Sequence, residues 1–292
     1  MPELPEVEQV RRSLERAVVG RPIADVRLLR REVVAMPDDP PGGFSRARTE
    51  RPGPIRRVPK QDLLAGQRIE RVSRHGKQLA LVSDAGRVLN VHLGMTGQFL
   101  CSGAGQRLAQ ADHVHVVWRL GDGGRLAFRD PRRFGGIWTC RDEADLLSRR
   151  WGMLGPDAAT IRASDLAAGL RGSRRAIKAA LLDQRVIAGV GNIYADEALF
   201  RARILPQRPG GSLTGAEVAA LCRAIRAILR DAIEAGGSTL RDYRDAEGRA
   251  GGYQDRHSVY GRGGQGCRVC SGMLESAVIG QRTTVWCPAC QR

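Results

Sequence analysis

The sequence predicts an α+β protein: an N-terminal helix plus a β-sandwich or flattened barrel, then a helical domain followed by a small metal-binding ribbon. Short alternating segments separated by Gly and Asp turns fill the first half of the 292-residue chain. Apolar residues at helical spacing fill most of the second half, and two Cys-x-x-Cys pairs close it. We place the three domains at residues 1–155, 156–262 and 263–292.

The N-terminal helix begins in a segment that has two interpretations. Pro5 suits its first turn, where a missing N–H costs nothing. Removal of the initiator Met would make Pro2 a free secondary amine, and α-amino groups titrate at roughly pH 7.7–8.0. Such an amine can attack an electrophilic carbon, and Glu3 beside it can move protons. The alternative is a frayed helix start. The helical spacing itself is carried by Val7, Val10, Leu14 and Val18.

The β-rich part begins with residues 23–34, which alternate well enough to form one strand. Residues 36–62 then mix prolines and glycines with many arginines, which is typical of a basic loop; we assign it no function beyond a contact with phosphate. Six further strands are predicted between turn residues, at 67–72, 78–83, 88–93, 113–120, 125–129 and 136–140.

Helical periodicity begins after the turn-forming sequence Leu-Gly-Pro-Asp near residue 155. Ser173 and Asn192 are residue types that cap helices. Gly189 and Gly191 make a tight turn before Asn192, which leaves free backbone N–H groups as an anion site; an ordinary capped helix pair is the alternative. Residues 236–265 form a Gly-rich polar loop. The predicted helices span 164–170, 173–182, 192–202 and 216–235.

Composition indicates an anionic polymer as partner. The formal charge is +16 and the isoelectric point about 10.7, which is typical of nucleic-acid binding but also of a merely soluble, arginine-rich protein. A DNA phosphate would fit the anion site above. The sequence contains no long apolar run and no leader, so we expect a cytoplasmic, nucleoid-associated protein with no membrane partner. Only three lysines are present: Lys60, Lys77 and Lys178.

The ribbon is predicted from Cys267, Cys270, Cys287 and Cys290, whose two pairs are separated by sixteen residues. Two tight knuckles at this spacing present four thiolates to one tetrahedral zinc ion. A closed four-sulfur site has no open position, so we expect one structural zinc per chain that does no chemistry. Residues 280–286 between the pairs alternate like a hairpin strand.

Several motifs occur together in one order along the chain: Pro-Glu-Leu-Pro-Glu-Val-Glu at 2–8, Gly-Lys at 76–77, His-Leu-Gly-Met at 92–95, Asp-Pro-Arg-Arg-Phe at 130–134, Gly-Val-Gly-Asn-Ile-Tyr at 189–194, and the cysteine ribbon with Gln-Arg at 281–282. The pattern resembles the formamidopyrimidine-DNA glycosylase (Fpg/MutM) family over essentially the whole chain. The resemblance implies a helix–two-turn–helix domain and base excision repair of oxidised purines, namely 8-oxoguanine and formamidopyrimidines. It also implies a monomer acting on double-stranded DNA.

The resemblance further implies catalytic roles. Pro2 would attack C1′ of the damaged nucleoside and form a Schiff base, Glu3 would assist proton transfer, and Glu6 would help to organise the site. Lys77 would be the acid for β-elimination, giving the AP lyase activity. Arg282 of the ribbon would grip a phosphate and aid δ-elimination. The alternative is that Lys77 is a solvated turn residue with no catalytic role.

DNA-contact roles follow in the same way. A flipped nucleotide leaves a gap that apolar wedges hold open, and an Arg can bond the widowed base. The matching residues are Met95, Phe134 and Arg132. The phosphate and other DNA contacts carried over from the family are His92, His113, Lys178 and Asn192. His75, His115 and His257 are expected to be structural.

Two departures from the family pattern leave this core intact. Residues 36–62 look like an insertion, and Ser173 stands where the family has a second phosphate-binding lysine, a contact that Arg174 would take over. Two alternative functions stay open: an endonuclease VIII-like glycosylase for oxidised pyrimidines, and a non-catalytic binder of damaged DNA. A basic zinc-ribbon protein of RNA metabolism is disfavoured, because it would need no N-terminal nucleophile.

Overall fold

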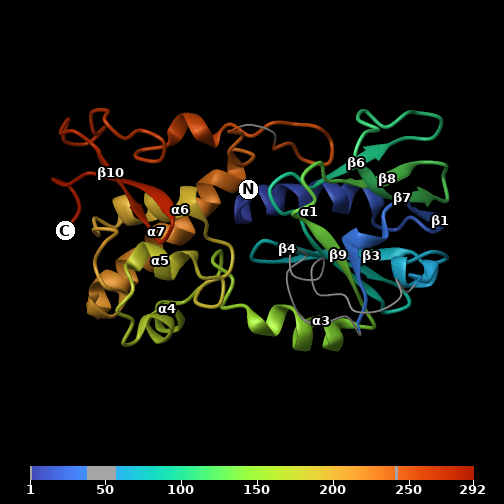
Figure 1. The fold of residues 1–292 in the computed structure, drawn as a ribbon, viewed down its shortest axis with the longest axis horizontal. Helices are drawn as coiled ribbons and strands as arrows, with labels where there is room; N and C mark the ends of the chain where they lie inside the picture. Colours follow the sequence, from blue (N-terminus) through green and yellow to red (C-terminus); the bar gives the residue numbers. More distant parts are fainter. Residues whose placement is uncertain (1, 38–56, 241–242) are drawn as a thin grey trace. The chain divides into compact units, whose positions relative to one another are not determined.

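The computed structural model describes residues 2–37, 57–240 and 243–292 (Figure 1). In their described parts, one compact unit comprises Pro2, Glu6–Met153 and Thr239–Gly251, and the other comprises Glu3–Pro5, Leu154–Ser238 and Gly252–Arg292. The terminal ribbon therefore belongs to the same unit as the helices. The division into three domains at 1–155, 156–262 and 263–292 remains a prediction.

The first unit contains most of helix α1 (Leu4–Val18) and two sheets, as a sandwich requires. One sheet has the order β1-β7-β8-β6 and the other β2-β9-β5-β4-β3. Its strands are β1 (Ile23–Leu28), β2 (Val34–Ala35), β3 (Ile69–His75), β4 (Gln78–Ser83), β5 (Val88–His92), β6 (Gln98–Ser102), β7 (Val114–Leu120), β8 (Arg125–Arg129) and β9 (Gly136–Cys140). The unit also contains the short helices η1 (Arg31–Val33), η2 (Lys60–Leu63), α3 (Glu143–Arg149) and η3 (Trp151–Met153).

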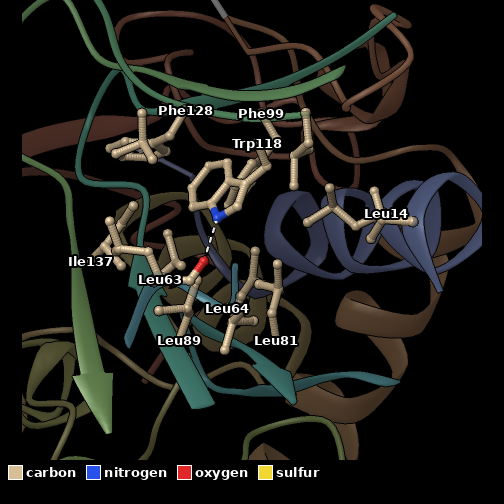
Figure 2. Packing of buried hydrophobic residues seen from close by; sticks show 14 of the residues in the cluster. Leu14, Leu63, Leu64, Leu81, Leu89, Phe99, Trp118, Phe128 and Ile137 are labelled. Atoms are coloured by element: carbon tan, nitrogen blue, oxygen red, sulfur yellow. Dashed lines mark hydrogen bonds between the residues drawn. The ribbon is translucent and has the colours of Figure 1, made fainter. Parts of the chain in front are cut away.

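Both sheets and α1 share one apolar core (Figure 2). The apolar face of α1, with Leu14 fully buried, packs into the same cluster as Trp118 of β7 and Leu81 of β4. Trp118 carries a polar group into this core, and its Nε1–H donates to the carbonyl of Leu63 at 2.9 Å. Burial of the strand faces therefore sets the strand register.

The second unit is helical and carries the ribbon. Its helices are α4 (Ala163–Leu170), α5 (Ile177–Leu182), α6 (Asn192–Arg201) and α7 (Gly215–Glu234), with the short turns η4 (Gly210–Ser212) and η5 (Tyr253–Arg256). Strands β10 (Glu275–Ile279) and β11 (Arg282–Trp286) pair antiparallel as the predicted hairpin. Thr214 and Glu217 form a capping box at the start of α7. Among the described residues, no helix combines the length and apolarity that crossing a membrane requires.

The α+β prediction is confirmed, but several local predictions were wrong. The expected strand 23–34 breaks after Leu28, because β1 pairs with β7 in one sheet whereas β2 pairs with β9 in the other. Strand β6 and helix α3 were not predicted. Ser173 does not cap a helix: α5 begins only at Ile177, because the chain before it bonds to the segment near residue 210. Most of the predicted basic loop, residues 38–56, lies outside the described residues.

Candidate functional site

Glu3 is bound at the N-terminus of α6. The N–H groups of Gly191 and Ile193 donate to its two carboxylate oxygens at 2.8 and 2.9 Å, and that of Tyr194 approaches at 3.4 Å. Only 3% of Glu3 is exposed. An anion is stabilised here because the first N–H groups of a helix lack backbone partners and carry partial positive charge. The predicted free phosphate site at this helix start is therefore wrong: the chain's own carboxylate occupies it.

The glycine pair before α6 has its role in the same contact. A Cβ on Gly191 would lie 2.4 Å from the carboxylate carbon of Glu3, and one on Gly189 would lie 2.5 Å from Leu4 Cδ1. Gly189 also has a φ of +114°, which side chains rarely adopt. The Leu4 N–H donates to the carbonyl of Gly189 at 3.1 Å. The Gly-Val-Gly turn is thus the surface on which the segment after Pro2 is fixed.

Asn192 is the first residue of α6, and the N-cap position predicted for it is held by Gly191. Its side-chain amide donates to the carbonyl of Thr283 in β11 at 3.1 Å. The Nζ of Lys178 donates to the same carbonyl at 3.0 Å, so both predicted phosphate ligands converge on one backbone atom of the ribbon. Their contacts with DNA stay predictions.

Lys178 is completely buried and forms an ion pair with Asp196, with 2.7 Å between Nζ and Oδ1. The other oxygen of Asp196 accepts from the Val285 N–H at 3.2 Å. Burial lowers the pKa of Lys178 against the opposing effect of Asp196, and burial raises the pKa of Asp196 to about 7. Sequence reasoning missed Asp196. The signal that could have found it is a charged residue among the mostly apolar residues of α6, nearly all of which are buried.

In the first unit, Lys77 and His92 lie close together because Gln78 pairs with His92 across β4 and β5. Lys77 is only 7% exposed, so the solvated-turn alternative is wrong. Burial, and then the charge of Lys77, lower the pKa of His92 to about 4, so its ring is neutral near pH 7. The Gly94 N–H donates to His92 Nδ1 at 3.1 Å, which leaves the proton on Nε2.

The three predicted wedge and base-contact residues belong to two touching turns. Met95 and Phe134 are 42% and 48% exposed, although both are large and apolar. Arg132 covers the Phe134 ring, with its Cζ 4.7 Å from the ring centroid. A Cβ on Gly94 would lie 2.4 Å from the Gly135 nitrogen, which shows how closely the turns approach.

Asp130, which sequence reasoning missed, fixes this surface. It is fully buried, accepts from Thr96 Oγ1 at 2.5 Å and from the Gly135 N–H at 2.8 Å, and so ties the two turns together. Its own N–H donates to the carbonyl of His113, whose exposed ring lies 3.6 Å from Asp112. The Nε2–H of His115 donates to the carbonyl oxygen of Asp130 at 2.9 Å, consistent with a structural residue.

The remaining predicted residues are placed as follows. Pro2 and Glu6 are buried, and the carbonyl of Glu6 accepts from the Tyr243 hydroxyl at 3.1 Å. Arg282 and Arg174 are exposed. The Ser173 hydroxyl is buried and has no hydrogen-bond partner in the part of the chain that the structure describes, so it does not replace the family lysine at the surface.

The ribbon residues fit a zinc ion. The sulfur atoms of Cys267, Cys270, Cys287 and Cys290 all lie within 4.8 Å of one another. A tetrahedral ion with Zn–S bonds of about 2.3 Å would separate its sulfur ligands by about 3.8 Å. The Sγ atoms of Cys270 and Cys287 are 3.4 Å apart, close to this separation. The four thiolates form a closed site for one structural zinc, as predicted.

Comparisons with known proteins agree with this geometry. Models of the formamidopyrimidine-DNA glycosylase N-terminal domain, its H2TH domain, and the zinc finger found in FPG and IleRS match residues 1–137, 154–244 and 264–292. Formamidopyrimidine-DNA glycosylases of Chloroflexus aggregans and Cereibacter sphaeroides are 44% and 43% identical and align with 100% of this chain and 98% and 100% of their own.

Solved structures show the same likeness. The MutM (Fpg) protein of Thermus thermophilus is 41% identical, with a TM-score of 0.80 over 99% of this chain and 98% of its own. A Lactococcus lactis Fpg mutant bound to Fapy-dG DNA is 31% identical, with a TM-score of 0.83 over 100% of both chains. The predicted resemblance is confirmed: the chain belongs to the formamidopyrimidine-DNA glycosylase family.

Proposed function

We propose that this protein is a bifunctional DNA glycosylase and AP lyase of base excision repair that removes oxidised purines through a Schiff base on Pro2. One observation carries the proposal: the residue next to Pro2, Glu3, is buried and held by the N–H groups that begin α6. A buried carboxylate fixed beside an N-terminal secondary amine fits covalent catalysis better than a frayed helix start.

The chemistry begins once Met1 has been removed. The Pro2 nitrogen attacks C1′, and the bond from C1′ to the damaged base breaks. Glu3 assists the transfer of a proton to the leaving base. Opening of the sugar ring converts the adduct to an iminium. Loss of a C2′ proton then expels the 3′ phosphate, and a second elimination expels the 5′ phosphate. The product is a one-nucleotide gap with phosphorylated ends.

Lys77 supplies the acid for β-elimination in this scheme, and Arg282 grips a phosphate and aids δ-elimination. The burial of Lys77 supports its role, because a shielded amine is held in place and protected from bulk water. Glu6 helps to organise the site around Pro2. The zinc ion supplies only structural support, because its four thiolate ligands leave no open position.

Contacts with DNA come from the remaining sites. Met95 and Phe134 wedge into the space left by the flipped nucleotide, and Arg132, already stacked on Phe134, bonds the widowed base. Neutral His92 donates from Nε2 to a phosphate. Further contacts come from His113, Lys178, Asn192 and Arg174, with Lys178 the one that must first turn away from Asp196. The protein acts as a monomer in the cytoplasm, associated with the nucleoid.

Structural relatives support the substrate class. Solved structures of the Lactococcus lactis Fpg contain Fapy-dG DNA, abasic-site DNA and oxidised-pyrimidine DNA, at 31% identity to this chain. We therefore expect cleavage of 8-oxoguanine and formamidopyrimidine sites, and the oxidised pyrimidines provide the second substrate to compare.

Sodium borohydride trapping tests the proposal. A duplex with one 8-oxoguanine opposite cytosine should give a covalent protein–DNA product, and Pro2→Gly should lose it. Trapping only on a thymine-glycol duplex would keep the mechanism and assign the endonuclease VIII-like substrate. Tight binding without trapping on either duplex would overturn the proposal in favour of a damage-binding protein.

A further inference from the structure

The hairpin that carries Lys77 is anchored at both of its ends. His75 ends β3 and Gln78 begins β4, and these two residues pair directly, so Gly76 and Lys77 are the two residues of the turn. Gly76 has a φ of +56°, as such tight turns require. The position of the Lys77 backbone therefore depends on what fixes His75 and Gln78.

One tryptophan contacts both ends. The ring of Trp151 stacks on that of His75, with 5.6 Å between centroids and 30° between planes. Its Nε1–H donates to Asn90 Oδ1 at 3.2 Å, and Asn90 Nδ2 donates to Gln78 Oε1 at 2.9 Å. Asn90 is fully buried in β5, so this amide cannot exchange its partners for water. Within this unit the indole thus braces one side of the turn directly and the other through a single amide.

These contacts are unusual for a strand interior. Asn90 lies between the apolar residues Leu89 and Val91 of β5, and a buried amide is costly unless it is fully bonded. Its side-chain bonds run outward, one to Gln78 in the Lys77 hairpin and one to Trp151 in the short helix after α3. Both polar atoms of the Asn90 side chain thus have a partner, and a bonded polar chain in a core favours one arrangement of the elements that it joins.

We propose that Trp151, acting through His75 and through Asn90, is a positioning residue that holds Lys77 for the elimination step. The inference rests on the proposed role of Lys77 in the proposed function. Trp151 does not itself react. Its indole restricts the tilt of the Gly76–Lys77 turn, and a misplacement of about 1 Å can slow a reaction by about a hundredfold.

Two steps of the reaction can be measured apart. Borohydride trapping on a duplex with a preformed abasic site reports the Pro2 imine, and strand cleavage of the same duplex without borohydride reports the elimination. Trp151→Phe keeps a ring for His75 but removes the donor to Asn90, and Trp151→Leu removes both. Both should trap at rates close to wild type and cleave more slowly, by about tenfold for Phe and more for Leu.

A double-mutant cycle separates positioning from general damage. In a Lys77→Ala background, Trp151→Phe should change the cleavage rate by less than about twofold, because the group through which it acts is gone. The pH profile of cleavage should also move in Trp151→Phe. The matched control is Trp118→Phe, which removes a buried indole and its bond to Leu63 from the other sheet and should leave the ratio of cleavage to trapping unchanged.

Each other outcome overturns the inference. Equal loss of trapping and cleavage in Trp151→Phe and Trp118→Phe would mean a purely structural residue. An unchanged cleavage rate, or the same Trp151 effect with and without Lys77, would mean that the indole does not act through Lys77. Failure of the wild-type protein to trap would reject the proposed function itself, and the inference with it.

Discussion

Replacing Gly191 by alanine should displace the Glu3 carboxylate from the start of α6. The added Cβ would lie 2.4 Å from Glu3 Cδ and 2.6 Å from Oε1, far inside the contact distance of about 3.5 Å. The φ of Gly191 is −130°, which alanine adopts without strain. The substitution therefore perturbs one contact and leaves the backbone conformation accessible.

The magnitude follows from the bonds that would be lost. Two N–H groups donate to the carboxylate at 2.8 and 2.9 Å, and hydrogen bonds to a charged group contribute about 1.5–3 kcal/mol each. A charge at a helix N-terminus adds about 0.3–2 kcal/mol. Water can replace part of these bonds after the side chain moves, so we expect the free energy of unfolding to fall by about 2–4 kcal/mol.

Urea unfolding and borohydride trapping measure the two consequences. Gly191→Ala should unfold at lower urea and trap the 8-oxoguanine duplex at least about tenfold more slowly, because Glu3 loses its fixed position and is the next residue in the chain after Pro2, the proposed nucleophile. Gly215→Ala is the control, since it adds a Cβ in α7 with nothing within 4 Å. A Gly191→Ala protein with the unfolding midpoint and trapping rate of the control would refute the reasoning.

Three further predictions concern the rest of the site. Asp196→Ala should lower the free energy of unfolding by about 3–5 kcal/mol, because the Lys178 amine stays buried without its carboxylate; adding Lys178→Met should recover part of the loss in urea unfolding, and a purely additive result would contradict the pairing. The unfolded chain protonates His92 near pH 6.5 but the folded protein only near pH 4, so the free energy of unfolding should fall, by up to about 3 kcal/mol, as pH decreases through this window; urea titrations of His92→Gln should show a flatter slope there, and an equal slope would contradict the shift. Removing zinc with a chelator, or Cys287→Ser, should unfold the ribbon in circular dichroism and abolish binding to the 8-oxoguanine duplex, whereas unchanged binding after verified zinc loss would contradict a structural role.

Local patterns in the sequence were sufficient for several elements. Four cysteines at fixed spacing predicted the zinc ribbon, because thiolate ligation depends on residue type and on two short loops. Alternation predicted most strands of the sandwich, and the ranges 78–83, 125–129 and 136–140 match β4, β8 and β9. The order of the motifs along the chain predicted the family. Each of these signals depends only on residue type and on spacing within a short segment, or on the order of short motifs along the chain.

Only the tertiary structure decided which group occupies each polar position. The sequence by itself indicated an anion site at the start of α6, but the anion is Glu3, which lies 188 positions from Gly191. The sequence predicted Lys178 as a phosphate ligand but not its partner, and the structure pairs it in the core with Asp196. Trp151 carried no signal until folding placed it against His75. The physical reason is common to all three: helix termini, buried charges and ring stacks take whatever partner long-range packing brings, and periodicity within a segment does not contain that information.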